Sequence, residues 1–157
     1  MDSIAPLQCR IQIDAAPAVV WELVGDIRRM PDWSPQVDGT RLTDGARRVE
    51  LGCTFVNDNS HGPLTWTTHG RVVRLTPGLE IAFRIEENWV VWSFSLTESE
   101  GGGTVLTQTR ETPEGISDYS LRLTDRYMGG QQVFTEMMRG GMEETLGKIK
   151  AEAERVP

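Results

Sequence analysis

Apolar and polar residues alternate near the start of the chain. Leu7, Cys9, Ile11 and Ile13 fall on one side of residues 7–13, and polar side chains fall on the other. This period of two predicts a half-buried strand. The same pattern, with turn residues marking its ends, predicts six further strands, which are residues 37–42, 54–56, 64–75, 79–85, 90–96 and 104–111.

Short turns rich in glycine, proline and asparagine separate these strands. Residues 57–63 read N-D-N-S-H-G-P, and we expect them to form a turn cluster that ends the strand beginning at Thr54. Residues 76–78 and 100–103 mark later turns in the same way. Regular strands joined by short turns are typical of an antiparallel meander.

Two other segments carry helical spacing. After the first strand, Pro17 suits the first turn of a short helix that ends near Gly25, and residues 28–33 are expected to add a second short helix. At the other end of the chain, apolar residues recur every three or four positions through residues 131–155. That segment predicts a helix about 35 Å long. Residues 114–130 predict a loop with a helical turn.

These elements predict how the chain is layered. A curved antiparallel sheet with one apolar face needs a cover, and the long amphipathic helix supplies it. The two short helices close one end. Sheet and helix need not meet along their whole length, so we expect a cavity between them.

The composition is that of an ordinary soluble globular protein. The chain has 157 residues, 38% of them hydrophobic, and a net charge of −7. That length favours a single domain over residues 1–157. The acidic balance argues against a nucleic-acid partner, and no apolar run approaches the ~20 residues of a membrane span. The N-terminus lacks the basic start and apolar stretch of a secretion signal, so we expect a cytoplasmic protein.

Motifs for metal or cofactor chemistry are missing from the sequence. The two cysteines, Cys9 and Cys53, match no metal-ligand spacing, and we expect them to be reduced and mostly buried. His61 lies in the expected turn and His69 on the outward parity of its strand, so both are expected at the surface. No H-E-x-x-H, P-loop or G-x-G-x-x-G motif occurs. We therefore expect neither a metal nor a cofactor.

Residues 13–35 read I-D-A-A-P-A-V-V-W-E-L-V-G-D-I-R-R-M-P-D-W-S-P. This stretch resembles the opening signature of the START-like, or SRPBCC, superfamily of polyketide cyclases, dehydrases and lipid-transport proteins. Residues 72–83, 92–104 and 141–146 agree with it. The resemblance implies an α+β helix-grip fold, in which a curved antiparallel sheet grips the long C-terminal helix over a ligand tunnel. Members include lipid carriers, hormone receptors and aromatase/cyclases, so the fold alone does not determine the activity.

Aromatic residues on the inward parity of the strands are the first candidate ligand contacts. Rings at these positions are either core residues or the walls of a pocket that stacks on a flat apolar ligand, and in this fold core and wall share one face. The residues with this pattern are Trp66, Phe83, Trp92 and Phe94.

Further candidates lie at the expected tunnel mouth, on the strands and on the long helix. Trp33 either gates the tunnel or plugs the second short helix. Thr68 and Gln108 have inward parity, and a buried amide or hydroxyl without a partner costs ~1–3 kcal/mol, so we expect Gln108 to face the ligand. Arg110 is expected to reach solvent at its strand end. Met137 suits adaptable apolar binding or ordinary packing.

Two functions of different classes are consistent with these residues. The first is binding or transport of a hydrophobic small molecule, such as a lipid, polyketide or isoprenoid. The alternative is a polyketide aromatase/cyclase or dehydratase. Superfamily members with that activity tend to place an arginine and a tyrosine inside the tunnel, where this sequence has Gly70 and Val37. Tyr119, Tyr127 and Arg126 are the residues that could substitute.

A third class is regulation of a protein partner through the groove beneath the helix. The sequence leaves the oligomeric state open between a monomer and a homodimer.

Overall fold

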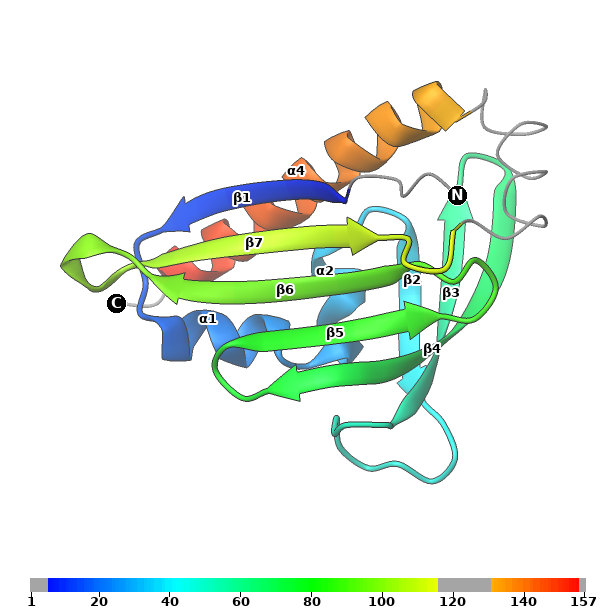
Figure 1. The fold of residues 1–157 in the computed structure, drawn as a ribbon, viewed down its shortest axis with the longest axis horizontal. Helices are drawn as coiled ribbons and strands as arrows, with labels where there is room; N and C mark the ends of the chain where they lie inside the picture. The colour runs from blue at the N-terminus through cyan, green and yellow to red at the C-terminus, as the bar shows by residue number, and fades with distance from the viewer. Residues whose placement is uncertain (1–5, 116–130, 156–157) are drawn as a thin grey trace.

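One antiparallel sheet dominates the structure (Figure 1). The computed structural model describes residues 6–115 and 131–155. Within these residues the sheet has seven strands in the order β1-β7-β6-β5-β4-β3-β2. The predicted meander therefore runs from β2 to β7, and β1 pairs with β7 along its whole length. The strands are β1 Leu7–Ile13, β2 Val37–Leu42, β3 Thr54–His61, β4 Leu64–Thr76, β5 Glu80–Ile85, β6 Val91–Glu98 and β7 Thr104–Glu111.

The helices lie where the sequence predicts them. The first is α1 Pro17–Val24, which begins at its proline. The predicted second short helix is a 3-10 turn, η1 Ile27–Arg29, followed by α2 Met30–Trp33. The long helix is α4 Gln131–Arg155. The sheet and this helix confirm the predicted α+β helix-grip fold. Within the described residues, no helix is long and apolar enough to cross a membrane.

The predicted turn cluster over residues 57–63 is wrong. Strand β3 continues to His61 and pairs with β4 up to Leu64, so the turn between them is only two residues long. Asparagine is usually depleted in strands. Here Asn57 and Asn59 are buried on the inner face, and cross-strand hydrogen bonds satisfy their side chains.

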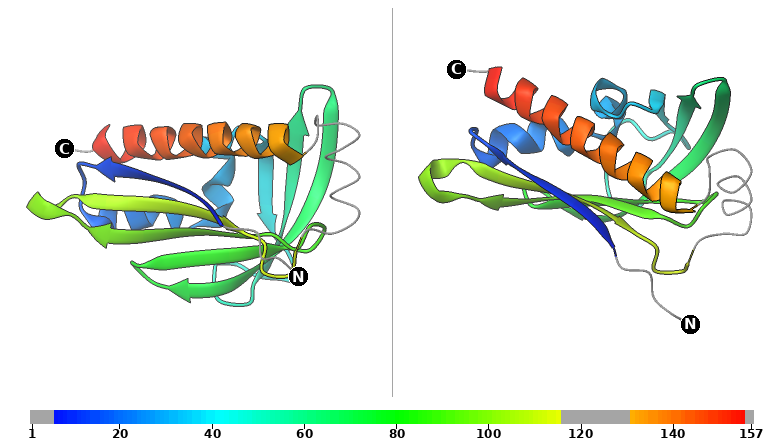
Figure 2. Two further views of the ribbon diagram at one scale, coloured as in Figure 1. Left: turned by 45° about the horizontal axis from the view of Figure 1, so that its top comes forward. Right: turned by 90° about the horizontal axis from the view of Figure 1, so that it is seen from above.

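The long helix α4 lies across β1 (Figure 2), and its C-terminal half packs into the core of the protein. Leu146, Ile149 and Ala153 are buried in the hydrophobic core. Polar contacts hold the same half to the end of β1, because Lys150 Nζ donates to the carbonyl oxygen of Gln12 at 2.8 Å. The backbone N–H of Asp14 donates to Glu154 Oε2, also at 2.8 Å. One end of the helix is therefore anchored on the sheet.

Beside the other half of the helix, the sheet curves so that β3 and β4 rise next to the end of α4 (Figure 2). Strand β4 has 13 residues, pairs with β3 up to Arg71 and with β5 from Gly70 onward, and shifts register between Val72 and Arg74. Such irregularities bend a strand and increase its twist. Figure 1 shows β3 and the start of β4 turned away from the direction of β5, β6 and β7. The bend leaves space between the inner face and the N-terminal half of α4.

Gly70 lies at this bend because an aromatic ring occupies the place of its side chain. A Cβ atom at Gly70 would overlap the ring of Phe55. The Phe55 ring packs edge-on against Phe83, with ring centroids 5.4 Å apart. A glycine in a strand often marks such a close approach.

Replacing Gly70→Ala is expected to destabilise the protein by about 1–3 kcal/mol, because the added methyl group displaces the Phe55 ring from a packed core. The matched control is Gly140→Ala in α4, where an added Cβ meets open space. That change is expected to stabilise the helix by up to about 1 kcal/mol. Urea unfolding followed by circular dichroism measures both. Equal stability of Gly70→Ala and the wild type would contradict the described packing.

Candidate functional site

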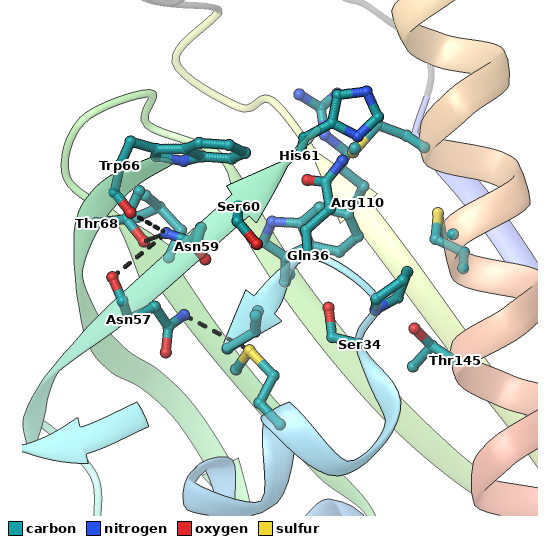
Figure 3. Close-up of a pocket in the computed structure, with 18 of the residues that line it drawn as sticks. Ser34, Gln36, Asn57, Asn59, Ser60, His61, Trp66, Thr68, Arg110 and Thr145 are labelled. Carbon is teal, nitrogen blue, oxygen red and sulfur yellow. Dashed lines mark hydrogen bonds between the residues drawn. The ribbon is translucent and has the colours of Figure 1, made fainter. Parts of the chain in front are cut away.

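A cavity of about 780 Å³ lies where sheet and helix diverge. Its walls come from β2 to β7, from α2 and the segment after it, and from residues 137–145 of α4 (Figure 3). This volume lies within the ~300–1,000 Å³ of typical small-molecule sites. The structure brings every site residue predicted from the sequence to this cavity, namely Trp33, Trp66, Thr68, Phe83, Trp92, Phe94, Gln108 and Met137.

Strand register explains why the aromatic residues meet. Phe83 on β5 lies directly opposite Trp92 on β6, and Phe94 follows two positions later on the same face. Phe83 and Phe94 are buried, whereas Trp92 and Trp66 are half-buried and leave part of each indole toward open space. The two phenyl rings therefore belong to the core and the cavity wall together.

Trp33 closes the wall on the side of α2. Only 4% of its surface is exposed, and it belongs to the main hydrophobic core. The guanidinium carbon of Arg29 lies 4.8 Å from the centroid of its ring. This burial favours the plug over the gate among the two predicted alternatives.

The sequence analysis missed Asn57 and Asn59 of β3, which form a polar ladder with threonines of β2 and β4. The side-chain amide of Asn59 donates to Thr68 Oγ1 at 3.1 Å and to the backbone oxygen of Trp66 at 3.3 Å. Thr40 Oγ1 donates to Asn57 Oδ1 at 2.7 Å. Figure 3 shows Asn57, Asn59, Trp66 and Thr68 together on one wall of the cavity. The alternation of Phe55, Asn57 and Asn59 was the available signal.

Gln108 differs from that ladder, because its amide is not fully paired. The residue is 8% exposed and lines the cavity from β7. Among the buried side-chain nitrogen and oxygen atoms of the described residues, only its Oε1 has no hydrogen-bond partner. An unpaired buried acceptor is costly, so such atoms are rare in native proteins. The expectation that Gln108 faces the cavity therefore agrees with its position.

Arg110, which was expected to reach solvent at its strand end, is half-buried and lines the cavity. It occupies the next inward position of β7, and its guanidinium carbon lies 5.9 Å from the centroid of the Trp92 ring. Burial lowers the pKa of the Arg110 guanidinium, which nevertheless stays charged at neutral pH because arginine titrates far above it. A cation therefore lines the cavity near the end of β7.

The two histidines lie at different places. His61 ends β3, is exposed and lines the rim of the cavity. His69 is exposed on the outer parity, as expected, and its Nδ1 lies 2.6 Å from Glu87 Oε2. Within the described residues, no group of three or more histidine, cysteine, aspartate or glutamate side chains is arranged to hold a metal ion.

Gly70 and Val37, the positions where cyclases tend to carry an arginine and a tyrosine, differ in their access to the cavity. Val37 lines the cavity, whereas Phe55 covers Gly70 and leaves no space there for a longer side chain. Arg110 supplies a cation from another strand. Tyr119, Tyr127 and Arg126 lie outside the described residues.

The unpaired amide predicts an unusual response to mutation. Gln108→Met keeps the side-chain length and removes the buried acceptor, so we expect the unliganded protein to gain on the order of 1 kcal/mol in its free energy of unfolding. The control is Gln8→Met on the outer face of β1, whose amide donates to Thr109 Oγ1 at 3.3 Å. That variant is expected to gain nothing. Urea unfolding measures both, and a loss of stability in Gln108→Met would mean that the amide is paired.

Comparisons with known proteins agree with this architecture. The family model described as polyketide cyclase/dehydrase and lipid transport matches residues 7–154. No curated protein sequence matches the chain.

Several solved structures share the fold. The Zhui aromatase/cyclase of a Streptomyces species superposes with a TM-score of 0.75 at 14% identity, covering 96% of this chain and 94% of that one. The major latex-like protein 151 of Panax ginseng gives 0.66 at 16%, covering 98% of both chains. A polyketide-cyclase-like protein of Corynebacterium glutamicum gives 0.61 at 26%, covering 95% and 91%. With its family model matched over residues 7–154 and its helix-grip fold shared with these structures, the chain belongs to the polyketide cyclase/dehydrase and lipid transport family.

Proposed function

We propose that the protein binds a hydrophobic small molecule, such as a lipid, a polyketide or an isoprenoid, in the cavity between the sheet and α4. The observation that carries this proposal is the cavity of about 780 Å³ with aromatic residues on its wall. Burying apolar ligand surface there contributes roughly 25 cal/mol per Å² before the costs of association. Binding therefore needs no covalent step and no cofactor.

The helix side of the cavity supports a ligand of adaptable shape. Met137, Met138 and Met142 line it, and methionine side chains are flexible and polarisable. Met137 and Met138 are only half-buried, whereas Met142 is 2% exposed. The two outer methionines can therefore repack around different apolar bodies, while the inner one belongs to the core.

Filling the cavity is expected to weaken binding. Met137→Trp places an indole in the space that the ligand would occupy, whereas Glu136→Trp, at an exposed position beside it, adds the same ring outside. We expect the first variant to lower the affinity for cis-parinaric acid and for pyrene by about tenfold or more, equivalent to roughly 1.4 kcal/mol, and the second to leave it unchanged. Fluorescence titration measures both affinities.

The proposal fails if the wild-type protein binds neither the acyl probe nor the aromatic one. It also fails if Met137→Trp and Glu136→Trp bind both probes as tightly as the wild type, because binding would then occur outside the cavity. Circular dichroism of each variant checks that the fold is kept.

Arg110 favours a second candidate function, a polyketide aromatase/cyclase or dehydratase. In an intramolecular aldol closure, a carbon–carbon bond forms between an enolised carbon and a ketone carbonyl, whose oxygen takes up a proton. A guanidinium inside the cavity is a donor suited to stabilise charge on that oxygen. The cyclase fold of one structural neighbour supports the same alternative by analogy alone.

A reactive poly-β-ketone mimic tests this alternative directly. If the protein is a cyclase, the wild type shifts the distribution of ring-closed products, and Arg110→Gln returns it to the uncatalysed distribution. Chromatography of the products measures the shift. Identical distributions with and without the wild-type protein would contradict catalysis and leave binding as the function.

A further inference from the structure

We propose that Gln108 is a specificity-determining acceptor that selects ligands carrying a hydroxyl donor on a hydrophobic body. This inference rests on the proposed binding function and names the ligand class that the cavity prefers, a hydrophobic alcohol or phenol. Its first support is the unpartnered Oε1 of Gln108, whose side chain is buried at the cavity wall.

The neighbours of Gln108 in the sheet do not supply the missing donor. Its cross-strand partners are Cys9 on β1 and Phe94 on β6. A phenyl ring donates no hydrogen bond, and a thiol is a weak donor. Leu106, the preceding inward residue of β7, is fully buried and apolar. Oε1 itself has almost no accessible surface, so a ligand in the cavity would supply the donor when the amide of Gln108 turns toward it.

The polar part of the cavity wall continues toward the C-terminal end of β7. Arg110 follows Gln108 on the same face, about 7 Å further along the strand, and also lines the cavity. The amide is an acceptor and the guanidinium is a donor. An oxygen-bearing edge of a ligand thus meets polar groups of both kinds along this strand.

The strand beside β7 presents rings at the matching positions. Trp92 lies opposite Arg110, and Phe94 lies opposite Gln108. A flat apolar body stacked along β6 would therefore direct its edge toward β7, where the acceptor is. At Gln108 this arrangement favours a ring system that carries a hydroxyl group, because an ionised carboxylate has no proton to donate to Oε1.

Three pyrene probes of nearly equal shape distinguish the effect of a hydroxyl donor on affinity from the effect of the apolar rings. 1-Hydroxypyrene carries a donor, 1-methoxypyrene has the oxygen without the proton, and pyrene has neither. Their affinities are measured by fluorescence titration at pH 7 with the wild type, with Gln108→Met and with the outer-face control Gln8→Met. Gln108→Leu provides a second variant without the amide.

The wild type is expected to bind 1-hydroxypyrene about tenfold more tightly than 1-methoxypyrene, because the methoxy probe leaves the buried acceptor of Gln108 without a donor. Gln108→Met and Gln108→Leu are expected to bind the two probes equally, and Gln8→Met is expected to keep the preference. Affinity for pyrene itself should change little in either Gln108 variant.

Equal affinity of the wild type for the hydroxyl and methoxy probes would overturn this inference and leave the proposed function intact. A preference that survives in both Gln108 variants would overturn it as well, since another group would then accept the proton. If none of the three probes binds, the proposed function and this inference fail together.

Discussion

A straight helix lying against a curved sheet is the constraint on which the rest of the structure depends. The two surfaces cannot stay in contact along their whole length, so they separate at one end. In the C-terminal half of α4, Leu146, Ile149 and Ala153 are buried in the core. Toward the other end, Met137 faces a cavity of about 780 Å³. The same helix therefore serves as the core cover at one end and as the wall of a binding site at the other.

The bend of the sheet depends on small and polar residues that would weaken an ordinary strand. Gly70 leaves room for the ring of Phe55 at the bend of β4. The hydrogen-bonded amides of Asn57 and Asn59 allow β3 to continue along the cavity. Gln108 is the contrasting case, because its Oε1 has no partner among the described residues. Without a ligand, a protein with an unsatisfied buried acceptor is less stable than the same protein with an apolar residue at that position. Such a loss of stability is expected where a residue serves ligand selection.

The sequence predicts the fold well because the spacing of apolar residues and the positions of turn residues agree over most of the chain. Strand β1 and helix α4 are predicted to the residue, since alternation and helical spacing are unbroken there. The error at β3 arose because Asn57 and Asn59 have turn propensity, and only the cross-strand partners reveal why they are in a strand. The site residues on the strands follow from strand parity, which determines the face of a side chain. Parity alone could not show that Arg110 lines the cavity at the end of its strand, because that depends on how the neighbouring strands curve.

The most direct test of the central claim is where a bound apolar molecule contacts the helix. Intermolecular nuclear Overhauser effects can be recorded between pyrene and methyl groups labelled in methionine and isoleucine. The account predicts contacts to the methyl groups of Met137 and Met138, which line the cavity, and none to Ile149, which is sealed in the core. Contacts to Ile149 without contacts to these methionines, or no contacts with any labelled methyl group at saturating pyrene, would contradict it.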